Sequence, residues 1–167
     1  MKPRVRLARP GARDAAEFLA AVRRSRRLHG NWVAAPATIA AYRKFLRRAR
    51  RPTQEAYFIC LRDAGELVGV VNVSEIVRGN FRSAYLGYYT FAPHQGQGLM
   101  AEGLRLVIHA AFRRLKLHRL EANIQPGNRA SRALVRGLGF RREGYSRRYL
   151  KIAGRWRDHE RWAITAE

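Results

Sequence analysis

Hydrophobic positions in the first third of the chain alternate between extended and helical spacing. Residues 4–9 read as a short strand. Residues 12–30 predict an amphipathic helix, because their apolar side chains fall on one helical face: Ala15, Phe18, Leu19 and Val22. After a loop, Thr38 is a good N-cap for a second helix over residues 39–50.

The middle of the chain has the two-residue alternation and the β-branched and aromatic content of strands. Residues 56–62 and 66–73 predict two strands, and the Asp-Ala-Gly stretch between them predicts a hairpin. A third strand is predicted over residues 84–91, which include the aromatic run YLGYYTF. These segments predict a largely antiparallel arrangement.

Helical periodicity returns in the second half. Residues 99–115 predict a helix whose apolar stripe is Met100, Leu104, Val107, Ala111 and Leu115. Residues 119–124 predict a short strand, and residues 128–138 a helix that ends before Gly139. A final hairpin is predicted to join residues 141–152 to 155–165 across Ala153-Gly154.

This order of elements mixes hairpins with strand–helix–strand crossovers. It predicts a mixed sheet covered by helices, in the α/β or α+β class. The chain has 167 residues, of which 47% are hydrophobic, and shows no repeat or low-complexity tract. We therefore expect one domain over residues 1–167.

The charge balance is the unusual part of the composition. Lys and Arg number 34 against 12 Asp and Glu, which gives a net charge of +22. Such a charge attracts polyanions, so nucleic acid, the ribosome surface and a phosphorylated cofactor are candidate partners. An Arg-rich background composition is the alternative, because the arginines are dispersed along the chain as well as clustered.

Cysteine content and hydropathy limit the possible cross-links, metal sites and cellular location of the protein. A single cysteine, Cys60, excludes an internal disulfide, and we expect no metal site. The N-terminus lacks the apolar region of a signal peptide, and no apolar run is long enough to span a membrane. We expect a cytoplasmic protein; the sequence leaves open whether it is a monomer or a dimer.

A glycine-rich corner separates the strand that ends near residue 91 from the helix that begins at residue 99. Gly96 and Gly98 flank Gln97 there. A helix N-terminus has unpaired N–H groups and a positive dipole, and glycines let an anion approach the main chain. The sequence is not a P-loop, since no Gly-Lys-Ser/Thr follows. A tight turn without a ligand is the alternative interpretation.

At this corner the sequence resembles the GNAT superfamily of N-acetyltransferases. Gln95-x-x-Gly98 is similar to the family's Gln/Arg-x-x-Gly-x-Gly/Ala motif, YLGYYTFAP to its cofactor-binding strand, and NIQPGNRASRALVRGLGFRREGY to its Asn-x-x-Ser helix. The resemblance implies a mixed, mostly antiparallel sheet of six or seven strands with about four helices, splayed between the strands ending near Phe91 and starting near Arg119. It also implies acetyl-CoA as cofactor, held by Phe91, Gln95, Gly96, Gln97, Gly98, Leu99, Met100, Asn128 and Ser131.

Further stretches resemble the RimJ/RimL type, the ribosomal-protein N-terminal acetyltransferases. These are GQGLMAEGL, LHRLEANI, EGYSRRYLKIAGRWRDH and SRRLHGNW. Two positions depart from the superfamily pattern. Met100 stands where Gly or Ala is usual, and Val135 stands where many members carry a tyrosine as general acid.

The implied reaction is acetyl transfer from a thioester to an amine, which needs donors for the oxyanion and for the departing thiolate. We place the oxyanion donor at the backbone N–H of Phe91. Ser131 is the first candidate for the thiolate, with Asn128 as its neighbour on one helical face. Tyr145 is an alternative donor. A helix cap and an ordinary helix-start serine are the structural interpretations of Asn128 and Ser131.

The general base must come from few acids. Glu121 lies in a strand beside the expected cleft, and Asp158 lies in the last strand with His159. Glu75 is a further candidate. Each acid could instead pair with an arginine, and a bound water could serve as the base. We rank Glu121 and Asp158 first.

Acceptor selectivity is expected in the first two predicted helices and the loop between them, residues 25–36, together with the last hairpin. Trp32 and Trp156 could line a groove there or cover the core. The leading functional hypothesis is an acetyltransferase for a protein N-terminus, with a ribosomal protein and contact with rRNA as candidates. Acetylation of a small amine, such as an antibiotic, amino acid or polyamine, is the runner-up. A nucleic-acid-binding module without catalysis is the third hypothesis.

Overall fold

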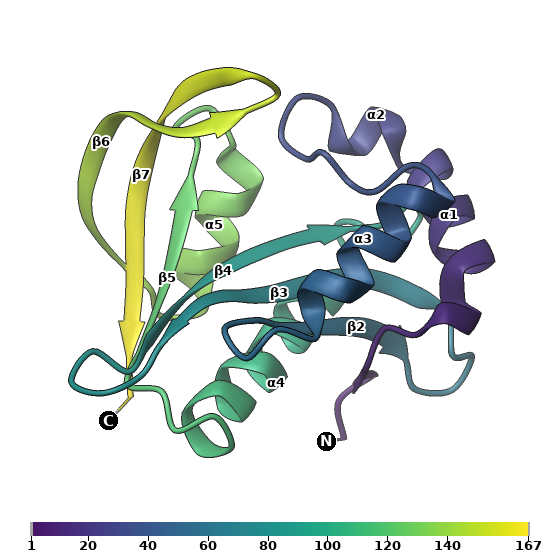
Figure 1. The fold of residues 1–167 in the computed structure, drawn as a ribbon, viewed down its shortest axis with the longest axis horizontal. Helices are drawn as coiled ribbons and strands as arrows, with labels where there is room; N and C mark the ends of the chain where they lie inside the picture. The colour runs from purple at the N-terminus through teal and green to yellow at the C-terminus, as the bar shows by residue number, and fades with distance from the viewer. Residues whose placement is uncertain (1, 167) are drawn as a thin grey trace.

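The computed structural model describes residues 2–166 and contains one mixed sheet of seven strands (Figure 1). The order across the sheet is β1-β2-β3-β4-β5-β7-β6. The strands are β1 (Val5–Ala8), β2 (Glu55–Leu61), β3 (Leu67–Val77), β4 (Ser83–Thr90), β5 (Arg119–Ile124), β6 (Arg141–Ile152) and β7 (Arg155–Thr165). The predicted mixed, mostly antiparallel sheet is confirmed.

Five α-helices accompany the sheet, one more than expected. They are α1 (Ala15–Arg24), α2 (Arg26–His29), α3 (Ile39–Ala49), α4 (Leu99–Arg113) and α5 (Arg129–Gly137). The side chain of Thr38 caps α3 by accepting the N–H of Ala41 at 3.1 Å, as predicted. No helix in the described part of the chain is both long and apolar enough to cross a membrane.

The extra helix arises because the predicted segment 12–30 is interrupted at Ser25. The hydroxyl of this fully buried residue donates to the carbonyl of Ala21 at 2.7 Å and accepts the N–H of Ala92 at 2.9 Å. A serine that bonds back to its own helix and outward to another segment favours a change of helix direction. The sequence pattern alone could not reveal the partner at Ala92.

Helices cover both faces of the sheet. In Figure 1, α1 and α3 lie in front of β2 and β3, and α4 and α5 lie behind the sheet. The front layer packs around Phe18, Tyr42 and Phe91, all fully buried or nearly so. The rear layer packs α4 and α5 against the other face, with Leu104 and Val107 in the core. Two apolar layers therefore hold the strands that carry the site.

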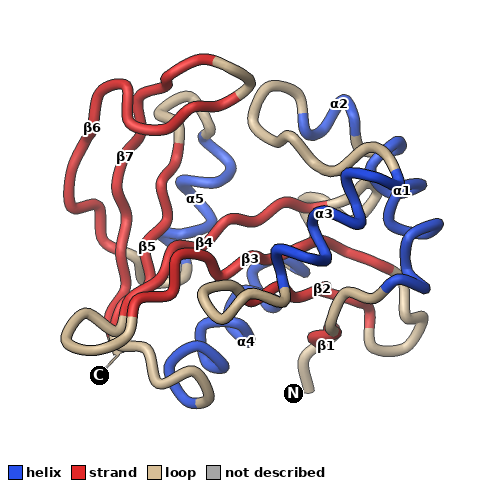
Figure 2. Tube along the Cα trace, viewed as in Figure 1, coloured by secondary structure: helices blue, strands red, loops and turns tan. Residues whose placement is uncertain are grey.

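The sheet opens at its centre, between β4 and β5. These parallel strands pair only from Ser83 to Tyr85, against residues 119–121. Beyond that point they diverge, while β5 continues to pair with β7 up to Ile124 (Figure 1). Figure 2 shows the loop after α2 facing the β6–β7 turn across this opening. The predicted splay is confirmed, and it opens toward the carboxyl ends of both strands.

Candidate active site

The loop between β4 and α4 has the backbone that an anion site needs. Gly96 and Gly98 have φ values of 74° and 75°, and no side chain caps α4. Within residues 2–166, no backbone N–H from residue 95 to residue 101 donates a hydrogen bond to the protein. A run of free amides at a helix N-terminus matches the acceptor oxygens of a diphosphate. The donor set thus fits the group that the sequence motif predicts.

Arg4, just before β1, forms hydrogen bonds with this loop and with α4. The guanidinium of Arg4 donates to the carbonyl of Gln97 at 2.9 Å and to the carboxylate of Glu102 at 2.6 Å. This contact with Arg4 lowers the pKa of Glu102. The two side chains therefore link the segment just before β1, the loop and the first turn of α4, so that the free amides keep a fixed orientation.

A cavity of about 480 Å³ lies beside the loop, and we call it the loop-side cavity. It is lined by β4, the loop, the starts of α4 and α5, and the segment 28–33. The predicted cofactor residues that line it are Gln95, Gly96, Gly98, Met100, Asn128 and Ser131. Leu99 is buried in the core behind them, and Gln97 is exposed at the loop tip.

Ser131 stands at the inner end of this cavity, one turn into α5. Its N–H donates to the side chain of Asn128 at 3.1 Å, so Asn128 caps the helix and also faces the cavity. The hydroxyl of Ser131 lies 2.7 Å from that of Tyr88 on β4. Burial raises the pKa of Tyr88 to about 12, so this phenol keeps its proton at neutral pH. The two hydroxyls thus place protons that could be donated beside the region where β4 and β5 no longer pair.

The sequence did not single out Tyr88. The signal was present, since Tyr88 lies in the aromatic run of the predicted strand. Three tyrosines stand in that run, however, and only the pairing of β4 decides which of them meets α5.

The prediction that the backbone N–H of Phe91 serves as the oxyanion donor is wrong. The N–H of Phe91 donates to the carbonyl of Val68 on β3 at 2.8 Å, and Phe91 is fully buried. Antiparallel partners alternate in the direction of their backbone groups, so the amides of Tyr88 and Thr90 face away from β3. The N–H groups that face the opening are therefore those of Tyr88 and Thr90, not that of Phe91.

A buried histidine holds the edge of this strand. His29 bonds the carbonyl of Thr90 through Nε2 at 2.8 Å. Because the carbonyl can only accept, Nε2 carries the proton. Burial lowers the pKa of His29, which favours the neutral ring. The contact fixes α2 against β4 at the mouth of the loop-side cavity.

A second cavity of about 410 Å³ lies on the other side of the opening, and we call it the hairpin-side cavity. β4, β5, the loop after α2 and the β6–β7 hairpin line it. Asn128, Ser131, Tyr88 and Trp32 line both cavities. The two spaces therefore meet at the Ser131–Tyr88 pair.

The two tryptophans expected at the acceptor groove differ in position. Trp32 lies at the junction of the cavities, where its ring would lie 3.1 Å from a Cβ at Gly127. Trp156 is 60% exposed near the hairpin turn and lines neither cavity. From the hairpin, Leu150 and Ile152 contribute to the wall instead.

Four of the ionisable side chains considered for proton transfer lie outside both cavities: Glu75, Glu121, Tyr145 and Asp158. Glu121 is paired with Arg119 at 2.8 Å. Asp158 accepts the N–H of Arg148 at 2.8 Å and the hydroxyl of Tyr145 at 2.7 Å on the exposed hairpin, and these bonds lower the pKa of Asp158. Because its pKa is lowered, Asp158 is a weak base. The position of all four side chains outside the cavities disfavours their assignment to proton transfer.

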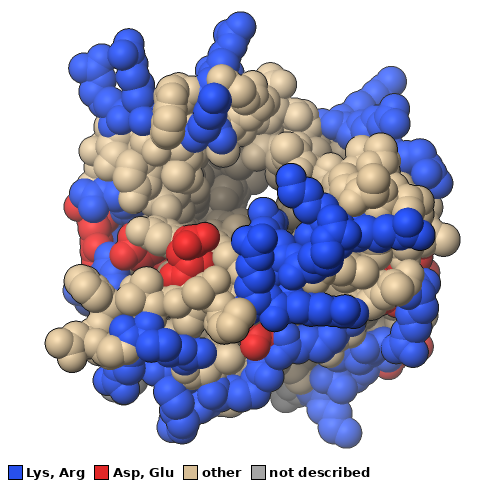
Figure 3. Space-filling view, in the orientation of Figure 1, with Lys and Arg blue, Asp and Glu red and all other residues tan. Residues whose placement is uncertain are grey.

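A basic groove continues from the hairpin-side cavity along α3. This α3 groove, of about 630 Å³, shares Ala34, Arg48, Asn72 and Tyr89 with the cavity. Its cations are Lys44, Arg47, Arg48 and Arg51. Figure 3 shows the hollow between the hairpin and the α2 loop, with Lys and Arg gathered over α3 beside it and acidic side chains on the opposite side.

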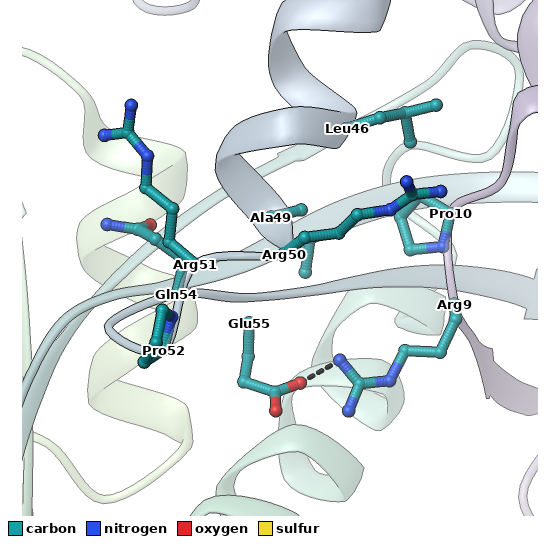
Figure 4. A pocket seen from close by; sticks show the side chains of 10 residues that line it. Arg9, Pro10, Leu46, Ala49, Arg50, Arg51, Pro52, Gln54 and Glu55 are labelled. Carbon is teal, nitrogen blue, oxygen red and sulfur yellow. Dashed lines mark ion pairs between the residues drawn. The ribbon is translucent and has the colours of Figure 1, made fainter.

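A separate cavity of about 460 Å³ lies at the C-terminal end of α3 (Figure 4). Its arginines are Arg9, Arg50 and Arg51, and Arg9 pairs with Glu55. No residue of the predicted site lines this cavity. The chemistry expected from the sequence therefore belongs to the two cavities at the sheet opening.

Comparison with known families identifies the fold. Residues 4–141 match the family described as acetyltransferase (GNAT) domain. The structure is similar to Mycobacterium smegmatis RimJ in complex with CoA-disulfide, with a TM-score of 0.88 and 30% identity, over 97% of this chain and 82% of that chain.

A curated relative is the ribosomal protein uS5-alanine N-acetyltransferase of Escherichia coli (strain K12), which is 46% identical over 103 residues. The match covers 62% of this chain and 53% of that protein, so the chain spans about half the length of the curated relatives it matches. A spermidine N-acetyltransferase from Vibrio cholerae, in complex with CoA and spermine, has a TM-score of 0.81 at 20% identity over 97% of this chain and 95% of that chain. That likeness shows the fold alone.

Proposed function

We propose that this chain, which belongs to the GNAT acetyltransferase family, transfers an acetyl group from acetyl-CoA to the N-terminal α-amine of a protein. The observation that carries the proposal is the meeting of two cavities at one hydrogen-bonded pair, Ser131 and Tyr88. One cavity leads to the anion-binding loop, and the other leads to a long groove. A donor and an acceptor can therefore reach the same point from opposite sides of the sheet.

Acetyl-CoA is the cofactor of the family and supplies an activated thioester. The free amides of residues 95–101 would hold its diphosphate. Asn128 and the open-side amides of Tyr88 and Thr90 would hold the arm that runs into the opening. These β4 amides also provide donors for the negative charge that develops on the acetyl oxygen.

The departing sulfur needs a proton. Ser131 would donate it through Oγ, and Tyr88 would replace that proton through their 2.7 Å hydrogen bond. Because the raised pKa of Tyr88 keeps the phenol protonated, the relay is available across the physiological pH range. Val135, where many relatives have a tyrosine, then needs no catalytic role.

The hairpin-side cavity and the α3 groove favour an acceptor that has a single amino group at the end of a polypeptide. Within residues 2–166, no Asp or Glu lines the hairpin-side cavity or the α3 groove, and four cations line the groove. A polyamine carries several positive charges, and this surface would repel them. A protein N-terminus carries one ammonium, and the residues that follow it could occupy the groove.

We propose a ribosomal protein as the acceptor and the cytoplasm as the setting. The similarity to an enzyme named for ribosomal protein uS5 supports this choice. The net charge of +22 favours approach to an rRNA surface. Oligomeric state does not enter the proposal.

A panel of acceptors tests the function. Purified protein would be assayed with acetyl-CoA against peptides that begin with Ala, Ser or Met, the same peptides blocked at the N-terminus, spermidine, and small amine antibiotics. Turnover with free N-termini, lost on blocking, is the expected result. Turnover with spermidine or an antibiotic alone would replace the proposal with a small-amine enzyme, and binding of RNA without any turnover would favour a non-catalytic module.

A further inference from the structure

The hairpin-side cavity contains a buried histidine that the relay at Ser131 does not use. His159 lies on β7, is only 2% exposed, and lines this cavity. The other two buried histidines line the loop-side cavity, where His29 bonds Thr90 and His94 pairs with Glu66 at 3.4 Å. Among the described residues, His159 is thus the one buried histidine on the acceptor side.

The hydrogen bonding of His159 leaves one ring nitrogen as a proton acceptor. Nδ1 lies 2.9 Å from the carbonyl of Arg157. A carbonyl can only accept, so Nδ1 carries the proton of the neutral ring and Nε2 has a free lone pair. Nε2 has no hydrogen-bond partner in the described part of the chain. The backbone carbonyl therefore fixes the tautomer that a general base requires.

A second unpartnered acceptor lies in the same cavity. The Oδ1 atom of Asn123 on β5 is buried and has no hydrogen-bond partner within residues 2–166. A buried acceptor without a partner is costly unless a ligand supplies the donor. An ammonium has three N–H donors, so one ligand group could satisfy both Asn123 and His159.

The charged groups around the hairpin-side cavity disfavour a positive charge on a bound amine. Arg157 and Arg161 flank it on β7, and Arg48 lines the cavity from α3. From β6, the ring of Tyr149 lies 6.4 Å away. β5 and the loop after α2 add no ionisable group to the lining, and no carboxylate there would stabilise the charged amine.

We propose that His159 is the general base and that Asn123 positions the acceptor amine. This inference rests on the proposed acetyl transfer. The ammonium passes one proton to Nε2 of His159 while Oδ1 of Asn123 accepts another of its N–H groups. The nitrogen lone pair then bonds to the acetyl carbon, the carbon–sulfur bond breaks, and its electron pair leaves on sulfur, which takes the proton of Ser131. The second proton that the new amide nitrogen must lose returns to the Ser131–Tyr88 hydroxyl pair, and His159 releases its proton to solvent.

The test uses a variant that keeps the structural hydrogen bond. In His159→Asn, the side-chain amide retains a donor near Nδ1 for the Arg157 carbonyl and removes the base at Nε2. The variant then depends on acceptor that is already neutral, a fraction that falls tenfold per pH unit below an α-amine pKa of about 8. kcat/KM for the acceptor in the panel that gives the highest turnover would be measured at several pH values.

We expect the ratio of wild-type to His159→Asn kcat/KM to be at least tenfold larger at about pH 6.5 than at about pH 9. Asn123→Ala should raise KM by a similar factor at every pH, because it removes binding rather than proton transfer. A His159→Asn ratio that does not change with pH would overturn the base assignment. Absence of wild-type turnover with every acceptor would instead refute the proposed function, so the two failures are distinct.

Discussion

At the scale of single residues, the proposed proton transfer depends on a contact between a strand and a helix. Tyr88 comes from β4 and Ser131 from α5, and they meet where β4 and β5 separate. Neither hydroxyl alone is unusual. Their value lies in the burial that keeps Tyr88 protonated and in the cap at Asn128 that fixes the first turn of α5.

Removing this pair should lower turnover without weakening cofactor binding. Ser131→Ala should reduce kcat by about 10²-fold, because it removes the proposed proton donor to the departing sulfur. Tyr88→Phe should reduce it by about tenfold, since Ser131 keeps its own proton to donate. The double variant should cost little more than Ser131→Ala, because the residues act in series. Steady-state kinetics and calorimetric titration of acetyl-CoA would measure both effects, and an unaltered kcat in Ser131→Ala would exclude the relay.

Residue roles were the least predictable part of the site from sequence. The glycine loop and the Asn128–Ser131 spacing carried local information, and the structure places both at one cavity. Phe91 was assigned to the wrong side because hydrogen-bond direction alternates with each residue along the strand. The partners of Glu121 and Asp158 are set by the pairing of strands and by the hairpin, which no local pattern reveals.

At the scale of elements, the joint between α1 and α2 connects the front helices to the loop that begins the site. Ser25 is that joint, because its hydroxyl bonds both Ala21 in α1 and Ala92 just after β4. The next helix, α2, then delivers His29 to the edge of β4. One buried hydroxyl therefore helps to set the position of the segment that lines the loop-side cavity.

Ser25→Ala should destabilise the fold by about 1–3 kcal/mol, because it leaves the buried N–H of Ala92 without an acceptor. Ser25→Thr keeps the hydroxyl and serves as the comparison. Urea unfolding would give the free energies, and acetyl-CoA titration would show whether the loop-side cavity changes with them. A Ser25→Ala variant as stable as wild type would show that this hydrogen bond does not secure the joint.

Elements themselves were largely predictable, because each depends on near neighbours. Alternation, hairpin signals and caps gave the strands and the starts of α3 and α5. The break at Ser25 was missed because its cause is a contact with Ala92, 67 residues away. The splay was expected only through the family resemblance, since periodicity does not say where paired strands diverge.

At the scale of the whole molecule, the cations are not uniform around the site. Those of the α3 groove lie beside the hairpin-side cavity, and the acidic side chains seen from that face lie across the hollow (Figure 3). Part of the net charge of +22 therefore lies beside the cavity that we propose for the acceptor. The order of residues along the chain does not separate these groove cations from the dispersed arginines.

The α3 groove should favour acceptors with acidic residues after the first few positions. In Lys44→Ala/Arg47→Ala, KM for such a peptide should rise about three- to tenfold, because attraction in the groove is lost. KM for a neutral peptide should change little. Arg23→Ala/Arg24→Ala removes the same charge from the exposed end of α1 and is the control. Equal effects of the two double variants would mean that only net charge matters.

The affinity of Gly96→Asp for acetyl-CoA, measured by calorimetry, tests most directly the claim that the loop amides hold the diphosphate. Gly79→Asp is the matched control, since both glycines have positive φ, 74° and 71°, and open space where a Cβ would lie. A carboxylate at residue 96 would repel the diphosphate and should raise the Kd at least tenfold, which is a loss of about 1.4 kcal/mol or more in binding free energy. Gly79→Asp should bind acetyl-CoA as wild type does. Wild-type affinity in Gly96→Asp would contradict the account, because the cofactor would then be held elsewhere.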